Sequence, residues 1–296
     1  MKINIIIPYR PLSRGFMQTG GGPLHQLPDG RWKDVDGSYF SSGERRPERE
    51  KDELLRAIKF LNKNSYVKHN IVVSVDDDVY PNDEYFKQFD NVLILRCTKH
   101  INDLPMYTPF YRMNNAAIEG INSIPDDEWI CHNYISDLIC AKHWDLPIIN
   151  AIQQYGENYV YVPMFVEIRR GLHSVTMMGM QATPHLIWEE WRKLCCHSLT
   201  MPVPACNYIT EADMENYIRI ANEGGKPPVI IEKSGDCIYG YFNVLIMKSK
   251  FAKRAIRFMG PGWDTDIDAR LYSECKLMKA VITRSFVFHP YSEFKW

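Results

Sequence analysis

Aspartates gather in two short stretches of this sequence, and carboxylates can bind metal ions, take up protons or accept hydrogen bonds from a nucleoside. The first stretch, VVSVDDDVYP, places Asp76, Asp77 and Asp78 directly after an apolar run. Adjacent residues of an extended chain point to opposite faces, so at most Asp76 and Asp78 could share one ion. We therefore favour a nucleoside contact by Asp76 or Asp77 over a metal ion or a solvated turn.

The second stretch, GPGWDTDIDAR, carries Asp264, Asp266 and Asp268 at alternate positions. Clustered carboxylates raise one another's pKa, which suits a general base working near neutral pH. The indole of Trp263 beside them could stack on a sugar ring. The alternative is the N-terminus of a helix, where aspartates interact favourably with the helix dipole.

Two further candidates are weak when taken singly. Asp137 follows an apolar run in ICHNYISDLIC, where an aspartate is commonly a turn residue. His289 ends the apolar run FVFHPYS, and a lone histidine there is more often packed than a ligand.

The elements that would position these residues alternate in type through the first half of the chain. Apolar runs typical of buried strands are predicted at 3–7, 71–75, 91–97 and 128–136, and helical patterns at 47–64, 82–89 and 111–124. This alternation predicts an α/β fold with a mostly parallel sheet flanked by helices. Ligands of such sheets bind beyond the carboxyl ends of the strands, where Tyr9, Arg10, Asp76 and Ser136 are predicted to lie.

The rest of the chain is less regular. Residues 11–47 form a polar, Gly/Pro-rich stretch that is long for a loop, which indicates a functional or partly disordered segment. A helical insertion is predicted at about 181–223, a helix from 249 and strands near 227–236, 239–249 and 280–292. We expect a single domain over 1–296, with a nucleotide-binding half at 1–145 and an acceptor and catalytic half at 146–296.

The composition of the chain argues against proteins that bind nucleic acid or membranes through a large net charge. The chain is 45% hydrophobic and 24% charged with a net charge of −1, so bulk attraction to nucleic acid or anionic lipid is not expected. No apolar run reaches the ~18 residues of a membrane span, and MKINIIIPYR is too short for a secretory signal. The eight cysteines form no C-x-x-C pair, which favours reduced, buried thiols and a cytoplasmic location.

The order of these motifs resembles that of the GT-A fold glycosyltransferases, and most closely the family-two-like inverting enzymes. IIIPYR and VVSVDDD are similar to the two strand ends that hold the base in that family. MNNAAIEG resembles its A-R-N-x-G-I helix, with Asn115 in the Asn place, Asn114 where Arg is usual, and Arg112 nearby. YISDLICAKHW resembles the D-x-D strand end with only Asp137 kept, and GWDTDIDAR resembles the catalytic segment with Asp266 in the base position.

The resemblance implies a GT-A type, Rossmann-like sheet and transfer of a sugar from a nucleotide sugar, most simply a UDP-sugar, to an acceptor hydroxyl with inversion. Asp266 would be the catalytic base, and Asp137 and His289 would hold Mn²⁺ or Mg²⁺, with the imidazole favouring Mn²⁺. The donor would contact Pro8, Tyr9, Arg10, Asp76, Asp77, Arg112, Asn115, Ser136, Trp263, Asp264 and Asp268.

Two other functions stay open. A sugar nucleotidyltransferase would use a similar nucleotide-binding half, but its Gly-rich first loop has only TGGGP at 19–23 as a counterpart. A non-catalytic nucleotide- or carbohydrate-binding relative would explain the incomplete D-x-D. The acceptor could be a glycan, a protein or a modified nucleobase, and the sequence predicts no oligomeric state.

Overall fold

The computed structural model describes residues 1–9, 31–33, 39–41, 47–76, 82–98, 108–132, 134, 138–168, 176–177, 229–231, 244–256 and 279–290. Within several of these elements only the course of the backbone is described.

Four parallel strands form the first half of the central sheet. They are β1 (Asn4–Tyr9), β4 (Asn70–Val75), β5 (Val92–Arg96) and β6 (Trp129–His132). β1 lies between β4 and β6, and β5 pairs with the outer side of β4. All six residues of β1 are buried, as expected of a parallel strand covered by helices on both faces. The predicted parallel sheet is therefore confirmed.

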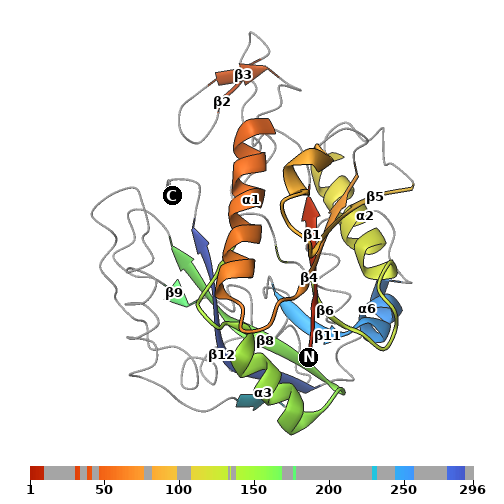
Figure 1. The fold of residues 1–296 in the computed structure, drawn as a ribbon, viewed down its shortest axis with the longest axis vertical. Helices are drawn as coiled ribbons and strands as arrows, with labels where there is room; N and C mark the ends of the chain where they lie inside the picture. The colour runs from red at the N-terminus through yellow and green to blue at the C-terminus, as the bar shows by residue number, and fades with distance from the viewer. Residues whose placement is uncertain are drawn as a thin grey trace.

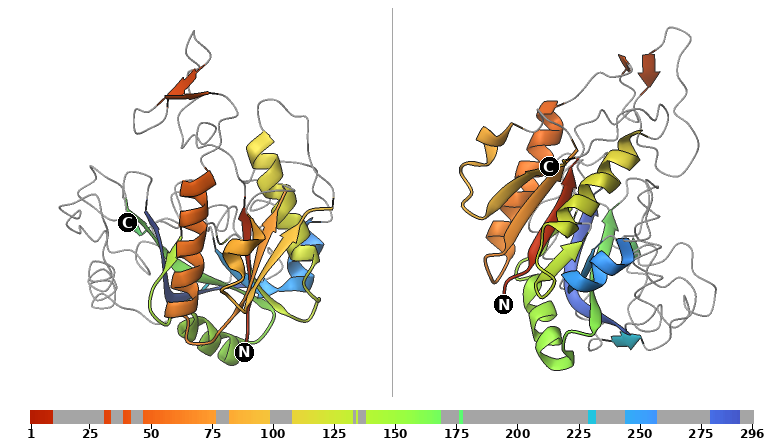
Figure 2. Two further views of the ribbon diagram at one scale, coloured as in Figure 1. Left: turned by 45° about the horizontal axis from the view of Figure 1, so that its top comes forward. Right: turned by 90° about the vertical axis from the view of Figure 1, so that its right-hand side faces the viewer.

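Helices cover both faces of this sheet (Figure 2). α1 (Pro47–Asn64) packs its buried face, with Leu54, Ile58 and Leu61, on one side. α2 (Thr108–Asn122) packs against β1 and β4 on the other side and contacts α6 (Ser249–Ile256). The predicted segment at 82–89 is a short 3₁₀ helix, η2 (Asp83–Phe86).

Gly120 lets α2 approach the sheet closely. A Cβ atom at this position would lie 2.7 Å from Cγ2 of Ile6 and 3.1 Å from Cβ of Ser74. Contact with both β1 and β4 fixes the helix against the strands that carry the candidate residues.

The second half extends the sheet with strands of both directions. These elements are β7 (Ile139–Cys140), α3 (Asp145–Tyr155), β8 (Tyr159–Ile168), β9 (Thr176–Met177), β10 (Val229–Ile231), β11 (Leu245–Lys248) and β12 (Lys279–Pro290). The sheet order is β10-β12-β8-β11-β6-β1-β4-β5, with β7 on β12 and β9 on β8. β7, β8, β9 and α3 were not predicted, although YVYVPMFVEI of β8 is rich in the β-branched and aromatic residues typical of strands.

Strand directions bring distant segments to one edge of the sheet. β11 is antiparallel to both β6 and β8, so β8 runs in the same direction as β6 and β1. β12 is parallel to β8. The carboxyl ends of β12 and β1 therefore point the same way, as their arrowheads show in Figure 1.

A bulge interrupts β12 between Ile282 and Phe286. The hydroxyl of Thr283 donates to the carbonyl of Val162 at 3.2 Å and accepts from the backbone N–H of Ser285 at 3.3 Å. Before the bulge β12 pairs with β10, and after it with β7. The bulge thus separates the two parts of β12 that have different partners.

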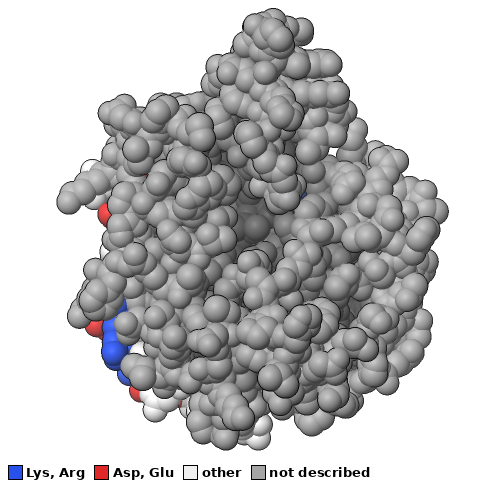
Figure 3. Space-filling model, turned by 180° about the vertical axis from the view of Figure 1, so that it is seen from behind, with Lys and Arg blue, Asp and Glu red and all other residues white. Residues whose placement is uncertain are grey.

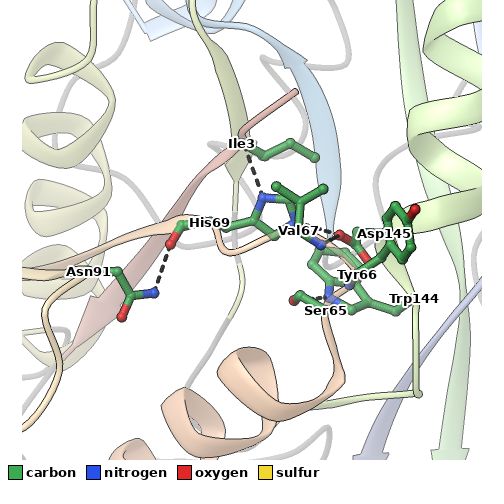
Figure 4. Close-up of polar contacts among 8 residues, drawn as sticks. All are labelled: Ile3, Ser65, Tyr66, Val67, His69, Asn91, Trp144 and Asp145. Carbon is green, nitrogen blue, oxygen red and sulfur yellow. Dashed lines mark hydrogen bonds and ion pairs between the residues drawn. The ribbon is translucent and has the colours of Figure 1, made fainter.

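A buried polar cluster around Asp145 lies at the amino ends of the parallel strands (Figure 4). The Nδ1 atom of His69 accepts from the N–H of Ile3 at 3.2 Å, so its Nε2 carries the proton that faces Asp145 Oδ2 at 2.9 Å. The backbone N–H groups of Tyr66 and Val67 also donate to the Asp145 carboxylate, at 2.7 and 2.9 Å. These bonds tie the start of α3 to the segments that lead into β1 and β4.

Two predictions differ from the structure. The strand expected at 128–136 ends at His132, the last residue paired with β11. The expected loop at 11–47 contains an antiparallel hairpin of β2 (Arg31–Lys33) and β3 (Tyr39–Ser41). The predicted helical insertion at 181–223 lies outside the described residues. Among the helices described, none is long and apolar enough to cross a membrane.

Candidate functional site

Asp76 follows β4 at the carboxyl edge of the parallel sheet and is buried, with 1% of its surface exposed. Its side chain lies on the α2 face, because alternation along the strand puts it on the side of Ser74, which faces Gly120. The carboxylate of Asp76 therefore lies at the end of the sheet where ligands of α/β proteins bind.

Asn115 of α2 is a hydrogen-bond partner of Asp76. Its Nδ2 atom donates to Oδ2 of Asp76 at 3.2 Å. Both residues are predicted from the sequence to contact the donor, and the structure brings them into direct contact with each other. The contact joins a strand end to the middle of a helix that is fixed on the same strand by Gly120.

Pro8 and Tyr9 end β1 beside β4, paired with Ser74 and Val75. Both are buried, and the side chain of Tyr9 belongs to the hydrophobic core on the α1 side. The backbone of Tyr9 is therefore at the candidate site, whereas its side chain packs on the face opposite Asp76.

Cys97 extends β5 at the same edge, and its N–H donates to the carbonyl of Val75 at 2.9 Å. Burial raises the pKa of its thiol to about 12, and the charges of Asp76 and Glu119 add to this. A thiol that stays protonated at neutral pH is a poor nucleophile, so Cys97 does not suit covalent catalysis.

His289 lies in the carboxyl-terminal part of β12, where its backbone pairs with Glu167. On its other side β12 pairs with β7, with Phe288 opposite Ile139 and Val287 opposite Cys140. Ile139 is two residues after Asp137. The pairing of β7 with β12 thus brings the chain that follows Asp137 next to the strand that carries His289.

The two parts of the edge are distinct. β8, β11, β6 and β1 lie between β12 and β4 in the sheet. The strands that carry Asp76 and His289 are therefore not neighbours in the sheet.

Several predicted site residues fall outside what the structure describes. The side chain of Arg112 is not described, although its backbone belongs to α2, and the same holds for His289 in β12. Residues outside the described segments are Arg10, Asp77, Ser136, Asp137, Trp263, Asp264, Asp266 and Asp268. Among described side chains, no group of three or more His, Cys, Asp or Glu residues could hold a metal ion.

The His69–Asp145 pair has the residue types of an acid–base couple, but its position differs from that of the candidate site. It lies at the amino edge of the parallel strands, and both side chains are buried. Burial raises the Asp145 pKa, but the hydrogen bonds from His69, Tyr66 and Val67 outweigh burial and leave this pKa below its ordinary value. All these bonds are internal, so the pair stabilises the fold. Sequence reasoning missed it, because 76 positions separate the partners.

Charged side chains near α6 are paired with one another. Lys250 and Lys248 contact Glu157 at 3.1 and 3.7 Å, and Lys253 contacts Asp126 at 2.8 Å. In the view from behind, basic and acidic atoms lie side by side at the lower left margin, on the side of α6 (Figure 3). These ion pairs do not form a basic surface of the kind that binds nucleic acid.

No protein-family model matches the chain, and no curated protein matches its sequence. Among solved structures, it is similar to one titled as a 4-diphosphocytidyl-2C-methyl-D-erythritol synthase, with a TM-score of 0.38, 8% identity and coverage of 100% of this chain and 92% of that one. A UTP-bound UGPase from Acinetobacter baumannii has a TM-score of 0.38 and 9% identity, covering 99% and 91%. A mycobacterial protein has a TM-score of 0.38 and 9% identity, covering 88% and 74%. None of these three titles names a glycosyltransferase, and the scores are too low for the likeness to bear on activity.

Proposed function

We propose that this chain is a transferase that uses a nucleotide sugar and moves the sugar to an acceptor hydroxyl. The observation that carries the proposal is the buried Asp76 at the carboxyl end of β4, in hydrogen-bonding contact with Asn115. A carboxylate at a strand end can accept hydrogen bonds from ribose hydroxyls or from the N–H groups of a base.

A divalent cation would stabilise the negative charge that develops on the departing diphosphate. Asp137 and His289 are the residues that we propose as its ligands, with Mn²⁺ favoured by the imidazole. Support comes from β7, whose pairing with β12 places Ile139 opposite Phe288. Ile139 follows Asp137 by two residues in the sequence, and Phe288 directly precedes His289.

The remaining roles rest on the sequence pattern alone. Asp266 would remove the proton from the acceptor hydroxyl, and Trp263 would line the sugar or acceptor pocket. Arg10 and Arg112 would assist the diphosphate.

The test is incubation of the purified chain with Mn²⁺ and, in turn, UDP-glucose, UDP-N-acetylglucosamine and GDP-mannose. Slow release of free nucleoside diphosphate through donor hydrolysis is expected. Exchange of labelled pyrophosphate into a nucleotide sugar would instead establish a nucleotidyltransferase. Binding without turnover would establish a non-catalytic relative, and no binding of any of these would overturn the proposal.

Two variants separate binding from chemistry. Asp76→Asn should weaken nucleotide-sugar binding about tenfold or more, since a charged hydrogen-bond acceptor contributes ~1.5–3 kcal/mol. Asp266→Asn should abolish turnover and leave binding nearly unchanged. Turnover that persists in Asp266→Asn would show that another residue is the base.

A further inference from the structure

Asn115 and Asp76 form a polar contact between the middle of α2 and the end of β4. The surrounding α2 residues Ala116 and Ala117 are buried, and Gly120 touches Ile6 and Ser74. The amide donates to the carboxylate at 3.2 Å, from a helix whose distance to the strand is fixed by the Gly120 contact.

We infer that Asn115 is a positioning residue for the proposed nucleotide site. It acts through Asp76, by holding one carboxylate oxygen and thereby setting the orientation in which the carboxylate meets the nucleoside. This role rests on the proposed function. It differs from the role implied by the family resemblance, in which Asn115 contacts the donor itself.

An amide is suited to this role because of its hydrogen-bonding chemistry. Nδ2 can only donate, and an ionised carboxylate can only accept, so the two groups can form one hydrogen bond in one direction. An aspartate at position 115 would have the same shape but would place two carboxylates within hydrogen-bonding distance. Such a pair takes up a shared proton, because two like charges that close together cannot both ionise freely.

Two other titratable groups lie in the described region near Asp76. Cys97 on β5 and Glu119 on α2 are near enough for their charges to interact, since both Asp76 and Glu119 raise the pKa of the Cys97 thiol. The thiol stays neutral through the neutral pH range, so it contributes no titration to a binding experiment there.

The inference is tested with the variant Asn115→Asp and with the nucleotide sugar that the wild type binds best among UDP-glucose, UDP-N-acetylglucosamine and GDP-mannose. The diphosphate diester of these ligands does not titrate between pH 5.5 and 8.5, so Kd is measured by calorimetry across this range. We expect a nearly constant wild-type Kd. For Asn115→Asp we expect binding to be weaker by about tenfold or more at pH 8.5 and to recover several-fold by pH 5.5, as the pair gains its proton.

Two further variants make the result specific. Asn115→Leu should weaken binding by a similar factor at every pH, because it loses the donor without adding a titrating group. Asn122→Asp adds the same charge at an exposed position of α2 and should change neither Kd nor its pH profile. The melting temperature of each variant without ligand shows that it has folded.

The outcomes are distinguishable. If the wild type binds and Asn115→Asp binds equally well at all pH values, the positioning role is overturned and the proposed function stands. A loss in Asn115→Asp that is independent of pH and matched by Asn115→Leu would also overturn it in favour of a structural role. If the wild type binds no nucleotide sugar, the proposed function itself fails.

Discussion

Single residues of this chain carry similar chemical groups in very different roles. Asp76 lies at the carboxyl edge with an amide partner on α2, whereas Asp145 lies at the opposite edge and receives hydrogen bonds from His69, Tyr66 and Val67. Both carboxylates are buried. Their positions relative to the direction of the strands, and not their burial, indicate which one can meet a ligand.

At this scale we predict that Asp145→Asn destabilises the protein by ~2–4 kcal/mol at pH 7, because it replaces a buried charge that accepts three hydrogen bonds. The folded pKa of Asp145 is below its ordinary value, so ionisation of this group stabilises the native state above about pH 4. That contribution is lost as the pH falls through the folded pKa. The free energy of unfolding, measured by urea denaturation, should therefore fall less between pH 7 and pH 3.5 in Asp145→Asn than in the wild type.

Asp90→Asn is the matched control for Asp145. Asp90 is also paired, with Lys68, but 78% of its side chain is exposed. Its removal should leave the urea midpoint close to that of the wild type, since exposed ion pairs contribute little. Equal effects of the two substitutions would contradict the structural role of the His69–Asp145 pair.

Among the elements, α2 connects the fold to the candidate site. It packs on β1 and β4, and one of its side chains reaches Asp76. Its close approach depends on Gly120, where any side chain would contact Ile6 and Ser74. The same helix therefore affects both stability and the proposed binding of nucleotide.

We predict that Gly120→Ala destabilises the protein by up to ~2 kcal/mol. The added methyl group overpacks the contact with the sheet at a cost of ~1–3 kcal/mol, from which the ~1 kcal/mol that alanine gains over glycine in a helix is subtracted. Displacement of α2 should also lengthen the contact between Asn115 and Asp76 and weaken nucleotide-sugar binding. Thermal melting and calorimetry measure the two effects.

Asn122→Ala serves as the comparison, since Asn122 is an exposed residue of the same helix. This substitution should keep or slightly raise the melting temperature. A Gly120→Ala protein as stable as the wild type would show that Ile6 can move aside without loss.

For the molecule as a whole, the sheet connects segments from both halves of the chain. β1 lies beside β6, β6 beside β11, and β12 beside β8. Cys97, Cys131 and Cys140 are buried at the end of β5, in β6 and in β7. Chemical labelling of these three thiols therefore measures the solvent exposure of three different parts of one sheet.

We predict that none of these three thiols reacts with iodoacetamide at pH 8 in the native protein. Burial raises the pKa of Cys97 and of Cys140 to about 12 and raises that of Cys131 further, so the reactive thiolates are scarce. In urea all three should become labelled, and at intermediate urea concentrations they should do so with the same midpoint. Peptide mass spectrometry follows each site separately, and a lower midpoint for Cys97 alone would show that the candidate edge opens independently.

The sequence by itself determined most elements of the first half and the residue types at their ends. Apolar runs predicted β1, β4 and β5, and the helical pattern at 47–64 predicted α1. Local periodicity suffices there, because each element buries its own apolar face and the connections are short. The alternation of strand and helix then predicted that Tyr9 and Asp76 lie at the carboxyl ends of strands, and the structure shows that these strands are neighbours.

Only the tertiary structure decided which distant residues meet. The antiparallel insertion of β11 returns β8 and β12 to the direction of β1, and the pairing of β7 with β12 brings the chain after Asp137 beside the strand of His289. The contacts of Asn115 with Asp76 and of His69 with Asp145 also join residues 39 and 76 positions apart. Strand register and helix approach depend on packing between remote segments, which no local pattern in the sequence specifies.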